Sequence, residues 1–482
     1  MSDAPAIVWL RQDLRLGDNP ALRAAIETKR PLVLLYVLDD ETPGRWRLGG
    51  ASRWWLHKSL SALGADVEKR GARLVLRKGA AAKVLPNLVK EIGAGAVFWN
   101  RCYEAYAIAR DKALKEKLSA DGLEVQSFNG ALLNEPWVVK TKTGEPYKVF
   151  TPYWRAARQV AERRAPLPTP KKLNGYAGDV ASERLADWKL SPTMPNWAAG
   201  FEDEWKPGEA GALAALRLFI KDRLRDYPEA RDTMGVHGTS RLSAHLHFGE
   251  ISPAQVRAAI ESAIHDAPAL QRGADKFMTE IGWREFSTNL LFHWPTLPEA
   301  NWRDNFDAFP WRDDAKALRA WRRGQTGYPI VDAAMRELWI SGTMHNRARM
   351  IAASFLIKHL LIDWRHGEAW FWDTLLDADL ANNAASWQWV AGSGADASPY
   401  FRIFNPITQG ERYDAEGAYV RKWLPELANL PDDVIHRPWE ADAATLRKAG
   451  VELDVTYPAP IVDHTAARAR ALEAFATLSS VG

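Results

Sequence analysis

The chain has 482 residues, of which 47% are hydrophobic and 26% charged, and this predicts a soluble protein of two to four domains with large buried cores. No apolar run reaches the roughly 18 residues that a membrane span needs, and the single cysteine, Cys102, excludes an internal disulfide framework and agrees with a cytoplasmic location. The net charge is only +3, so nucleic-acid binding has to be argued from local clusters of basic residues.

Residues 1 to about 130 alternate short β-prone runs with helical patterns, which is typical of a parallel α/β sheet. The N-terminus lacks a basic start and a cleavage signature, so we expect its first apolar run to be a strand. Neither a P-loop nor a dinucleotide fingerprint occurs. We therefore predict a Rossmann-like sheet of five parallel strands without a visible nucleotide site. The predicted strands are Ile7 to Leu10, Leu32 to Leu38, Leu74 to Leu76, Val97 to Trp99 and Val125 to Phe128.

Two further parts follow this α/β domain. Residues 131 to 204 are rich in Pro, Lys and Arg and show little sustained periodicity, so we predict a long connector over the surface. From 205 to about 475 the apolar residues follow the helix period, as they do behind Pro329. We predict an all-helical domain there.

Residues 377–389 hold two acids, three amides and two indoles within thirteen positions. If the segment from Asp379 onward is helical, then Asp379, Asn383 and Trp387 share one face. A carboxylate, an amide and an indole can bind the edges and the face of a flat heteroaromatic ring. The spacing allows equally a helix N-terminus with an acid at the cap and indoles in the core.

Hydroxyls and Arg241 cluster in residues 238–243, where a loop meets a helix. This combination suits phosphate oxygens, although a plain helix cap would use the same residues. Glu280 and Trp283 share a helix face, with a surface ion pair from Glu280 to Arg284 as the alternative. Asn346, Arg349 and Met350 project together in the same way, and a basic helix surface is their alternative interpretation.

Metal and hydrolytic chemistry are poorly supported. His245, His247 and Glu250 are close in sequence, but they lack a zinc-helix spacing and follow the cap motif, which favours structural roles. No serine elbow occurs, and Cys102 has no local nucleophile signature. We predict no metal site. Tryptophan is the compositional outlier, with 23 residues against 12 tyrosines, and this favours stacking or electron transfer besides core packing.

Seven motifs together resemble the photolyase and cryptochrome family, specifically its cyclobutane pyrimidine dimer photolyases. They are Gly-Thr-Ser-Arg-Leu-Ser at 238–243, Trp-Arg-Glu-Phe at 283–286, Gly-Tyr-Pro-Ile-Val-Asp at 327–332, Met-His-Asn-Arg-Ala-Arg-Met at 344–350, Asp-Ala-Asp-Leu at 377–380, Trp-Gln-Trp at 387–389 and Pro-Tyr-Phe-Arg-Ile-Phe-Asn-Pro at 399–406. The resemblance runs from the first strand to about residue 470. Photolyases act on bases taken out of the DNA stack.

The resemblance implies an FAD site in the helical domain. The phosphates and ribose would be held by Tyr227, Thr239, Ser240, Arg241, Leu242 and Ser243, and the flavin ring would be lined by Asp377, Asp379 and Asn383. Arg349 would pair with Asp377. Asn383 would lie near flavin N5, where an amide tolerates the anionic reduced ring but a carboxylate would repel it or donate a proton.

The resemblance also implies a substrate site and a light-driven reaction. Glu280, Asn346 and Met350 would face the flipped pyrimidine dimer, Trp283 and Trp389 would stack on it, and Arg347 and Arg402 would reach DNA phosphates. Trp387, Trp364 and Trp311 match the chain of indoles that conducts electrons from the surface to the flavin. Excited reduced FAD would pass an electron to the dimer, which splits and returns it.

One departure concerns the antenna pigment. Folate-binding relatives often place an Asn-Glu pair after Tyr-Glu, whereas here Tyr103-Glu104 is followed by Ala105, Tyr106 and Ala107. A differently held methenyltetrahydrofolate, an 8-hydroxy-deazaflavin and no antenna all stay open, and we favour folate. Beyond damaged DNA we expect no obligate protein partner and a monomer. A cryptochrome is the main rival, and a (6-4) photolyase would be expected to carry a second histidine at Asn346.

Overall fold

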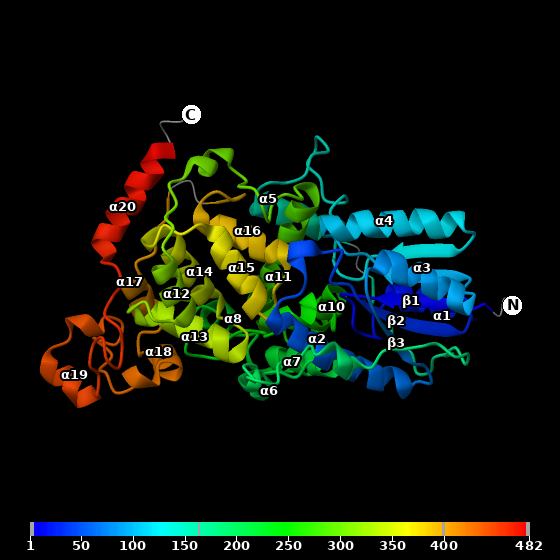
Figure 1. Ribbon diagram of the computed structural model, residues 1–482, viewed down its shortest axis with the longest axis horizontal. Helices are drawn as coiled ribbons and strands as arrows, with labels where there is room; N and C mark the ends of the chain where they lie inside the picture. The colour runs from blue at the N-terminus through cyan, green and yellow to red at the C-terminus, as the bar shows by residue number, and fades with distance from the viewer. Residues whose placement is uncertain (1–3, 162–163, 398–400, 479–482) are drawn as a thin grey trace.

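The computed structural model describes residues 4–161, 164–397 and 401–478. The molecule is elongated, with the sheet and the N-terminus at one end and a mass of helices with the C-terminus at the other (Figure 1). Pro399 and Tyr400, in the last of the seven motifs, lie outside the described residues. Within these ranges no helix is both long and apolar enough to cross a membrane.

The sheet has five parallel strands in the order β3-β2-β1-β4-β5, as predicted. Its strands are β1 (Ala6–Leu10), β2 (Leu32–Leu38), β3 (Leu74–Lys78), β4 (Ala96–Asn100) and β5 (Glu124–Phe128). Every residue of β1, β2 and β4 is buried, as expected for a parallel sheet that helices cover on both faces.

Alternate residues of each strand pack into two different hydrophobic cores, one on each face of the sheet. Val8 and Leu34 pack with α1 (Pro20–Glu27) and α2 (Gly50–Glu68), whereas Ile7 and Val33 pack with α3 (Ala81–Ile92) and α4 (Ala105–Ala120). This alternation is the two-residue period of a strand. The N-terminal third is therefore a three-layer α/β unit.

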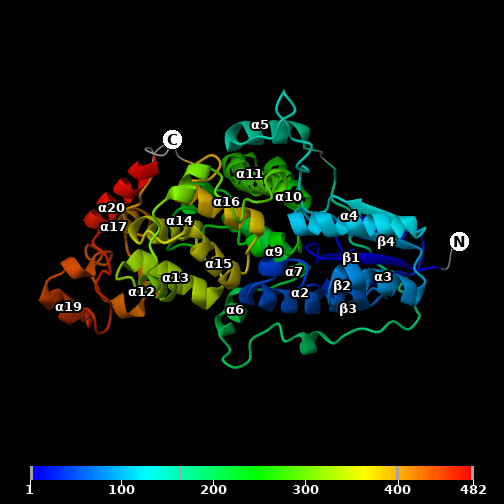
Figure 2. The same cartoon turned by 45° about the horizontal axis from the view of Figure 1, so that its top comes forward.

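The connector is more ordered than its composition predicts. It contains α5 (Phe150–Val160), a 3-10 turn (Leu185–Trp188) and α6 (Ala199–Glu204). The buried residues of α5, among them Tyr153 and Trp154, recur at helical spacing and join the core of the helical part. Between α5 and α6 the chain runs along the outside of the sheet (Figure 2), where Tyr176 and Glu183 bond to strand carbonyls. The boundaries at 130 and 204 stay predictions.

The rest of the described chain is helical, as predicted, with no further strand. Its helices are α7 (Glu209–Asp222), α8 (Tyr227–Ala230), α9 (Ser243–His247), α10 (Pro253–Asp266), α11 (Gln271–His293), α12 (Ala315–Arg323), α13 (Pro329–Ser341), α14 (Asn346–Ser354), α15 (Trp364–Thr374), α16 (Leu380–Ala391), α17 (Pro406–Tyr413), α18 (Ala418–Trp423), α19 (Ala443–Ala449) and α20 (His464–Thr477). A π-helical turn, Phe355–His359, follows α14. Helices α11, α13, α14, α15 and α16 pack on one another around the largest core.

Candidate functional site

One cavity of about 680 Å³ opens among the helices of the C-terminal part. Segments of the chain that are far apart in sequence converge on it, and five of the seven motifs contribute lining residues. Most of the predicted site residues line this cavity: Tyr227, Thr239, Ser240, Arg241, Leu242, Ser243, Glu280, Trp283, Asn346, Arg349, Met350, Asp377, Asp379, Asn383, Trp387 and Trp389. Arg347, Arg402, Trp311 and Trp364 are not among the lining residues.

Asp377 precedes α16 and is paired as expected. Its Oδ2 accepts a hydrogen bond from Arg349 Nη2 at 2.9 Å. Burial opposes the charge of this carboxylate, but the Arg349 guanidinium and the Ser243 hydroxyl hold the pKa of Asp377 below its usual range. Its Oδ1 is buried and has no hydrogen-bond partner. Asp377 therefore brings an ionised, half-satisfied carboxylate to the cavity.

Asp379 caps helix α16 and also lies at the cavity. As the N-cap of α16 its Oδ1 accepts hydrogen bonds from the backbone N–H of Asn382 at 2.8 Å and from Asn382 Nδ2 at 2.7 Å. The carboxylate also lines the cavity, together with Asn383. Burial raises the pKa of Asp379, yet His247 and Arg284 outweigh it and lower that pKa to about 2. The residue is ionised at neutral pH.

The loop before α9 does not act as a plain helix cap. Leu242 occupies the N-cap position, and no side chain caps the helix. Arg241 adopts a left-handed conformation at φ 56° and donates from Nη1 to Glu204 Oε2 at 2.8 Å, with its guanidinium 4.2 Å from the Trp205 ring. The hydroxyls of Thr239, Ser240 and Ser243 thus lie at the cavity without a capping role.

Glu280 lies at the cavity on α11. It pairs with Arg231 of the segment after α8 and with Lys276 Nζ at 3.2 Å. The alternative interpretation, a surface ion pair with Arg284, is wrong, because Arg284 Nη1 donates to the carbonyl of Ala131 at 2.9 Å. Arg231 is separated from Glu280 by 49 positions, so no local spacing rule could have found it.

The start of α14 is held by residues that the sequence did not single out. His345 is its N-cap, and Nδ1 accepts from the backbone N–H of Arg347 at 3.2 Å. The backbone N–H of His345 donates to Glu337 Oε2 at 2.9 Å, and the Tyr419 hydroxyl donates to the same oxygen at 2.5 Å. Burial lowers the pKa of His345 to about 4, so the cap is neutral. This arrangement positions Asn346 at the cavity.

Two indoles form walls of the cavity. Trp283 stacks in parallel on Phe150, with ring centroids 3.6 Å apart and 9° between the planes. Trp389 donates its indole N–H to the Asp396 carbonyl at 3.1 Å. Both rings are therefore fixed in orientation by neighbours from outside their own helices or turns, which is what a stacking surface requires.

The three predicted electron-transfer indoles differ in position. Trp387 lines the cavity with Phe371 4.9 Å and Trp321 6.2 Å from its ring centroid. Trp364, on the adjacent helix α15, is fully buried and donates to Asn301 Oδ1 at 3.0 Å. Trp311 is partly buried against Phe309. No ring-to-ring contact joins the three within the described residues, and their shared role stays a prediction.

The two arginines expected to reach DNA lie beyond the cavity wall. Arg347 pairs with Asp232, at 3.0 Å between Nη2 and Oδ1, and its guanidinium lies 4.3 Å from the Tyr413 ring. Arg402 is exposed, with its guanidinium 4.9 Å from the Phe404 ring. Contact of either residue with DNA stays a prediction.

The His-Glu cluster after the phosphate-type loop divides in two. Glu250 is fully buried and accepts from Trp55 Nε1 at 3.0 Å and from the Gly208 N–H at 2.7 Å, and it lies 2.5 Å from His245 Nδ1. These residues form a structural pair. Across the described ranges no group of three His, Cys, Asp or Glu side chains is placed to hold a metal. His247, in contrast, faces the cavity.

Charged side chains pack near the carboxyl ends of β1 and β4. Strand order reverses between β1 and β4, where parallel sheets bind ligands beyond their carboxyl ends. Arg11 follows β1 and pairs with Asp111 at 2.8 Å, and both Arg11 and Arg110 lie over the Trp9 ring. Nearby, burial raises the pKa of Cys102 to about 12. The α/β part thus has the predicted Rossmann-like topology, with Arg11, Arg110 and Asp111 packed together near the point where strand order reverses.

Comparison with known proteins finds similarity to photolyases over nearly the whole length of the chain. Residues 6–171 match a family described as DNA photolyase, and residues 277–477 match the FAD binding domain of DNA photolyase. The deoxyribodipyrimidine photo-lyase of Agrobacterium fabrum is 55% identical over 99% of both chains, and cryptochrome-1 of Arabidopsis thaliana is 39% identical over 98% of this chain and 70% of its own. The crystal structure of a class III photolyase from Agrobacterium tumefaciens superposes with a TM-score of 0.95 at 55% identity, covering 100% of this chain and 98% of that one.

Proposed function

This chain belongs to the DNA photolyase family, and from that premise we propose that it binds FAD in the cavity and uses light to split cyclobutane pyrimidine dimers in DNA. One observation carries the proposal. All the residues matched to the flavin site and most of those matched to the dimer site line the same cavity, although they lie as far apart in sequence as Tyr227 and Trp389. A cavity of about 680 Å³ is also in the range of ligand sites.

The residues of the cavity fit FAD. Thr239, Ser240, Arg241 and Ser243 would hold the phosphates and ribose, because hydroxyls and a guanidinium are good partners for phosphate oxygens. The buried Asp377 Oδ1 has no partner in the protein and would gain one from the ring system. Bound and reduced, FAD would supply the photoexcitable electron that opens the dimer.

Asn383 favours repair over signalling in this family. It is buried beside the cavity and donates from Nδ2 to the Glu368 carbonyl at 3.0 Å. A neutral amide there tolerates a negative charge on the reduced ring, whereas a carboxylate would repel it or donate a proton. We therefore place this chain with the photolyases and not with the cryptochromes.

The same cavity would take the extruded dimer. Glu280, Asn346 and Met350 would face it, and Trp283 and Trp389 would provide apolar surfaces for stacking. Arg347 and Arg402 would bind backbone phosphates and fix the register of the DNA. Asn346 stands where a (6-4) photolyase would be expected to carry a histidine, so we assign cyclobutane dimers as the substrate.

For an antenna pigment we infer methenyltetrahydrofolate over 8-hydroxy-deazaflavin. Arg11 and Arg110 both pair with Asp111, and we infer that a pigment is held away from these paired side chains. Absorption spectra before and after denaturation distinguish flavin, folate and deazaflavin. A deazaflavin band released on denaturation would contradict this choice.

Repair of defined lesions tests the function. The FAD-loaded, reduced protein is illuminated with near-ultraviolet or blue light in the presence of an oligonucleotide with one thymine dimer, and the monomer is quantified. We expect dimer splitting in light, none in the dark, and none of a (6-4) photoproduct. Absence of splitting by fully reduced, FAD-loaded protein would reject the proposal in favour of a light sensor.

A further inference from the structure

Trp364, the middle indole of the predicted electron-transfer chain, is joined to a carboxylate at the surface by one buried amide. Its ring is fully buried, and its indole N–H donates to Asn301 Oδ1 at 3.0 Å. Asn301 is 5% exposed, and its Nδ2 donates to Asp307 Oδ1 at 2.7 Å. A hydrogen-bonded path therefore runs from the buried ring to an exposed acid of the 3-10 turn Asp304–Ala308.

The segment around Asn301 is tied to α16 by a second buried amide, that of Gln388. Gln388 is fully buried, its Oε1 accepts from the backbone N–H of Trp302 at 2.7 Å, and its Nε2 donates to the carbonyl of Ala300 at 2.8 Å. Both chain neighbours of Asn301 are thus bonded to one side chain. The acceptor for Trp364 is held in place beforehand and needs no rearrangement when the charge of the indole changes.

Two other ionisable groups lie beside Trp364 on α15, and neither brings an unbalanced charge to the ring. The Arg365 guanidinium is 4.7 Å from the Trp364 ring and would oppose a positive charge there, but it pairs with Asp363 at 2.9 Å. One turn further along the helix, burial raises the pKa of Glu368 well above its usual range, so this acid is neutral. The amide of Asn301 and the acid behind it are the contacts that favour positive charge on the ring.

An indole that gives up an electron becomes a cation, and its N–H becomes a much stronger donor. A hydrogen bond to an ionised group is roughly twice as strong as a neutral one, and buried bonds in a chain polarise one another. We propose that Asn301 and Asp307 stabilise the oxidised form of Trp364 and so favour the passage of its electron to Trp387. The inference rests on the proposed function.

The electrons balance along the three indoles. Light moves one electron from Trp387 to oxidised FAD, Trp364 replaces the electron that Trp387 lost, and Trp311 replaces the electron that Trp364 lost. A thiol in solution then reduces Trp311. The indole proton of Trp364 stays on its nitrogen, because an amide oxygen is too weak a base to take it. Asn301 is therefore a positioning residue, which acts by holding a charge on the ring of Trp364.

Transient absorption of the oxidised, FAD-loaded protein after a laser flash measures the yield of the tryptophan radical that escapes recombination. We expect Asn301→Leu to lower this yield about tenfold, because the buried N–H loses its acceptor. Asp307→Asn keeps the acceptor but removes the charge, and we expect a yield about threefold lower. Asp304→Asn is the matched control, because it removes the same charge from the same turn and leaves the bond between Asn301 and Asp307 intact. Its yield should equal that of the wild type.

The exchange variant, Asn301→Asp combined with Asp307→Asn, separates this role from a merely structural one. It keeps both hydrogen bonds and moves the carboxylate onto the N–H of Trp364, so we expect a radical yield equal to that of the wild type or higher. Nuclear magnetic resonance in the dark follows the indole N–H of Trp364, which is assigned by its loss in Trp364→Phe. We expect its proton signal to move downfield in the exchange variant and upfield in Asp307→Asn.

A wild-type radical yield in Asn301→Leu would overturn the inference. So would equal losses in Asp304→Asn and Asp307→Asn, or a yield in the exchange variant as low as that of Asn301→Leu. Repair by chemically pre-reduced protein should be the same in every variant, because it does not use the indoles. Failure of the pre-reduced wild type to split thymine dimers would instead refute the proposed function, so the two failures are distinguishable.

Discussion

Glu280 is a carboxylate at the cavity whose side chain is held in place by two cationic neighbours. Arg231 and Lys276 form ion pairs with it, so the negative charge of the carboxylate is balanced and its orientation is fixed. We predict that Glu280→Ala slows dimer repair on the order of tenfold to a hundredfold, the loss of one charge-assisted hydrogen bond, while FAD affinity changes little. Repair kinetics and FAD titration check this. Equal effects on both would place Glu280 in the flavin site, and Glu229→Ala, which breaks an exposed pair with Arg272, is the control.

Trp387 is the predicted electron-transfer indole that lines the cavity. Phenylalanine preserves the packing against Phe371 but is much harder to oxidise than an indole. We predict that Trp387→Phe suppresses photoreduction of oxidised FAD and leaves repair by chemically pre-reduced protein largely intact. Trp302→Phe, at an indole outside the cavity that packs on Trp294, is the control. Loss of both activities to the same extent would contradict an electron-transfer role.

At the scale of the element, the N-terminus of α14 depends on a neutral histidine cap. Asparagine caps helices well, so His345→Asn should keep the stability of the wild type near pH 7, whereas His345→Ala should lose about 1 kcal/mol. In the wild type the unfolded ring takes up a proton near pH 6.5, but the folded ring does so only near pH 4. Stability is therefore lost as the pH falls from about 6.5 to about 4.

Urea unfolding at several pH values measures this contribution. The decline of the unfolding free energy between pH 6.5 and pH 4 should be shallower in His345→Asn than in the wild type, because the substitution removes the titrating ring. Parallel curves for the two proteins would show that His345 is not the titrating cap. The change is local to α14, so FAD content at pH 7 should match that of the wild type.

The elements that sequence patterns predict well are those whose burial is local and periodic. The strand runs match closely, and β2 has the predicted bounds, because a strand buried on both faces is a continuous apolar run. Helix α13 begins at Pro329, as the pattern indicated, because proline suits the first position of a helix. Helix α5 was missed because its apolar stripe lies within a Pro- and Arg-rich connector and is buried by tertiary contacts, among them those with α11.

The site residues also divide into those that local sequence patterns reveal and those that only tertiary contacts bring to the site. Motif positions such as Asp377, Asp379 and Asn383 were singled out because they are close together in sequence, and all three line the cavity. Arg231, Glu337 and Tyr419 were missed because they reach Glu280 and His345 only through tertiary contacts. A sequence pattern shows which residues share an element face. It does not show which distant element completes their hydrogen bonds.

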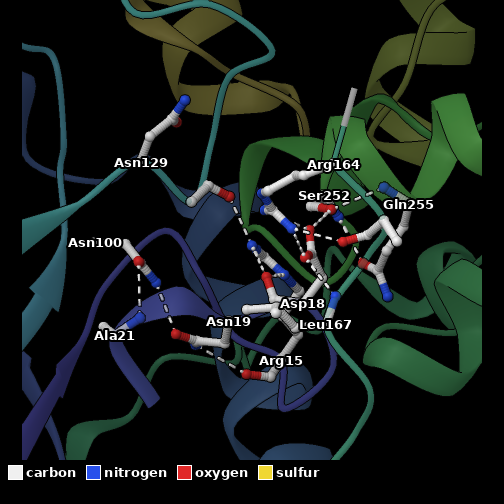
Figure 3. Close-up of polar contacts among 12 residues, drawn as sticks. Arg15, Asp18, Asn19, Ala21, Asn100, Asn129, Arg164, Leu167, Ser252 and Gln255 are labelled. Carbon is white, nitrogen blue, oxygen red and sulfur yellow. Dashed lines mark hydrogen bonds and ion pairs between the residues drawn. The ribbon is translucent and has the colours of Figure 1, made fainter. Parts of the chain in front are cut away.

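At the scale of the whole molecule, a buried polar cluster joins the α/β part to the helical part (Figure 3). Asp18, in the loop after β1, accepts from Arg164 of the connector, from the N–H of Leu167 and from the hydroxyl of Ser252, the N-cap of α10. Arg15 is fully buried and donates to the carbonyls of Gly130 and Gly249. The α/β part is therefore fixed to the helices that build the cavity.

We predict that Asp18→Asn destabilises the protein by about 2–4 kcal/mol, because a buried carboxylate with three donors becomes an amide that cannot satisfy them all. Asparagine tolerates the left-handed conformation of this position, φ 47°, so backbone strain does not confound the result. Urea unfolding measures the change. Arg23→Ala breaks an exposed ion pair with Glu27 and should cost less than about 1 kcal/mol. Similar losses of unfolding free energy in both variants would show that the cluster around Asp18 does not stabilise the protein more than an exposed ion pair does.

In the proposed function, one cavity brings a reduced flavin and an extruded pyrimidine dimer within electron-transfer reach. The fluorescence lifetime of the bound, reduced flavin measures this most directly. We predict that an oligonucleotide with one thymine dimer shortens the lifetime, because electron transfer competes with emission, and that the same strand without the lesion leaves it unchanged. An identical lifetime with the two oligonucleotides, at concentrations where both are bound, would contradict the account.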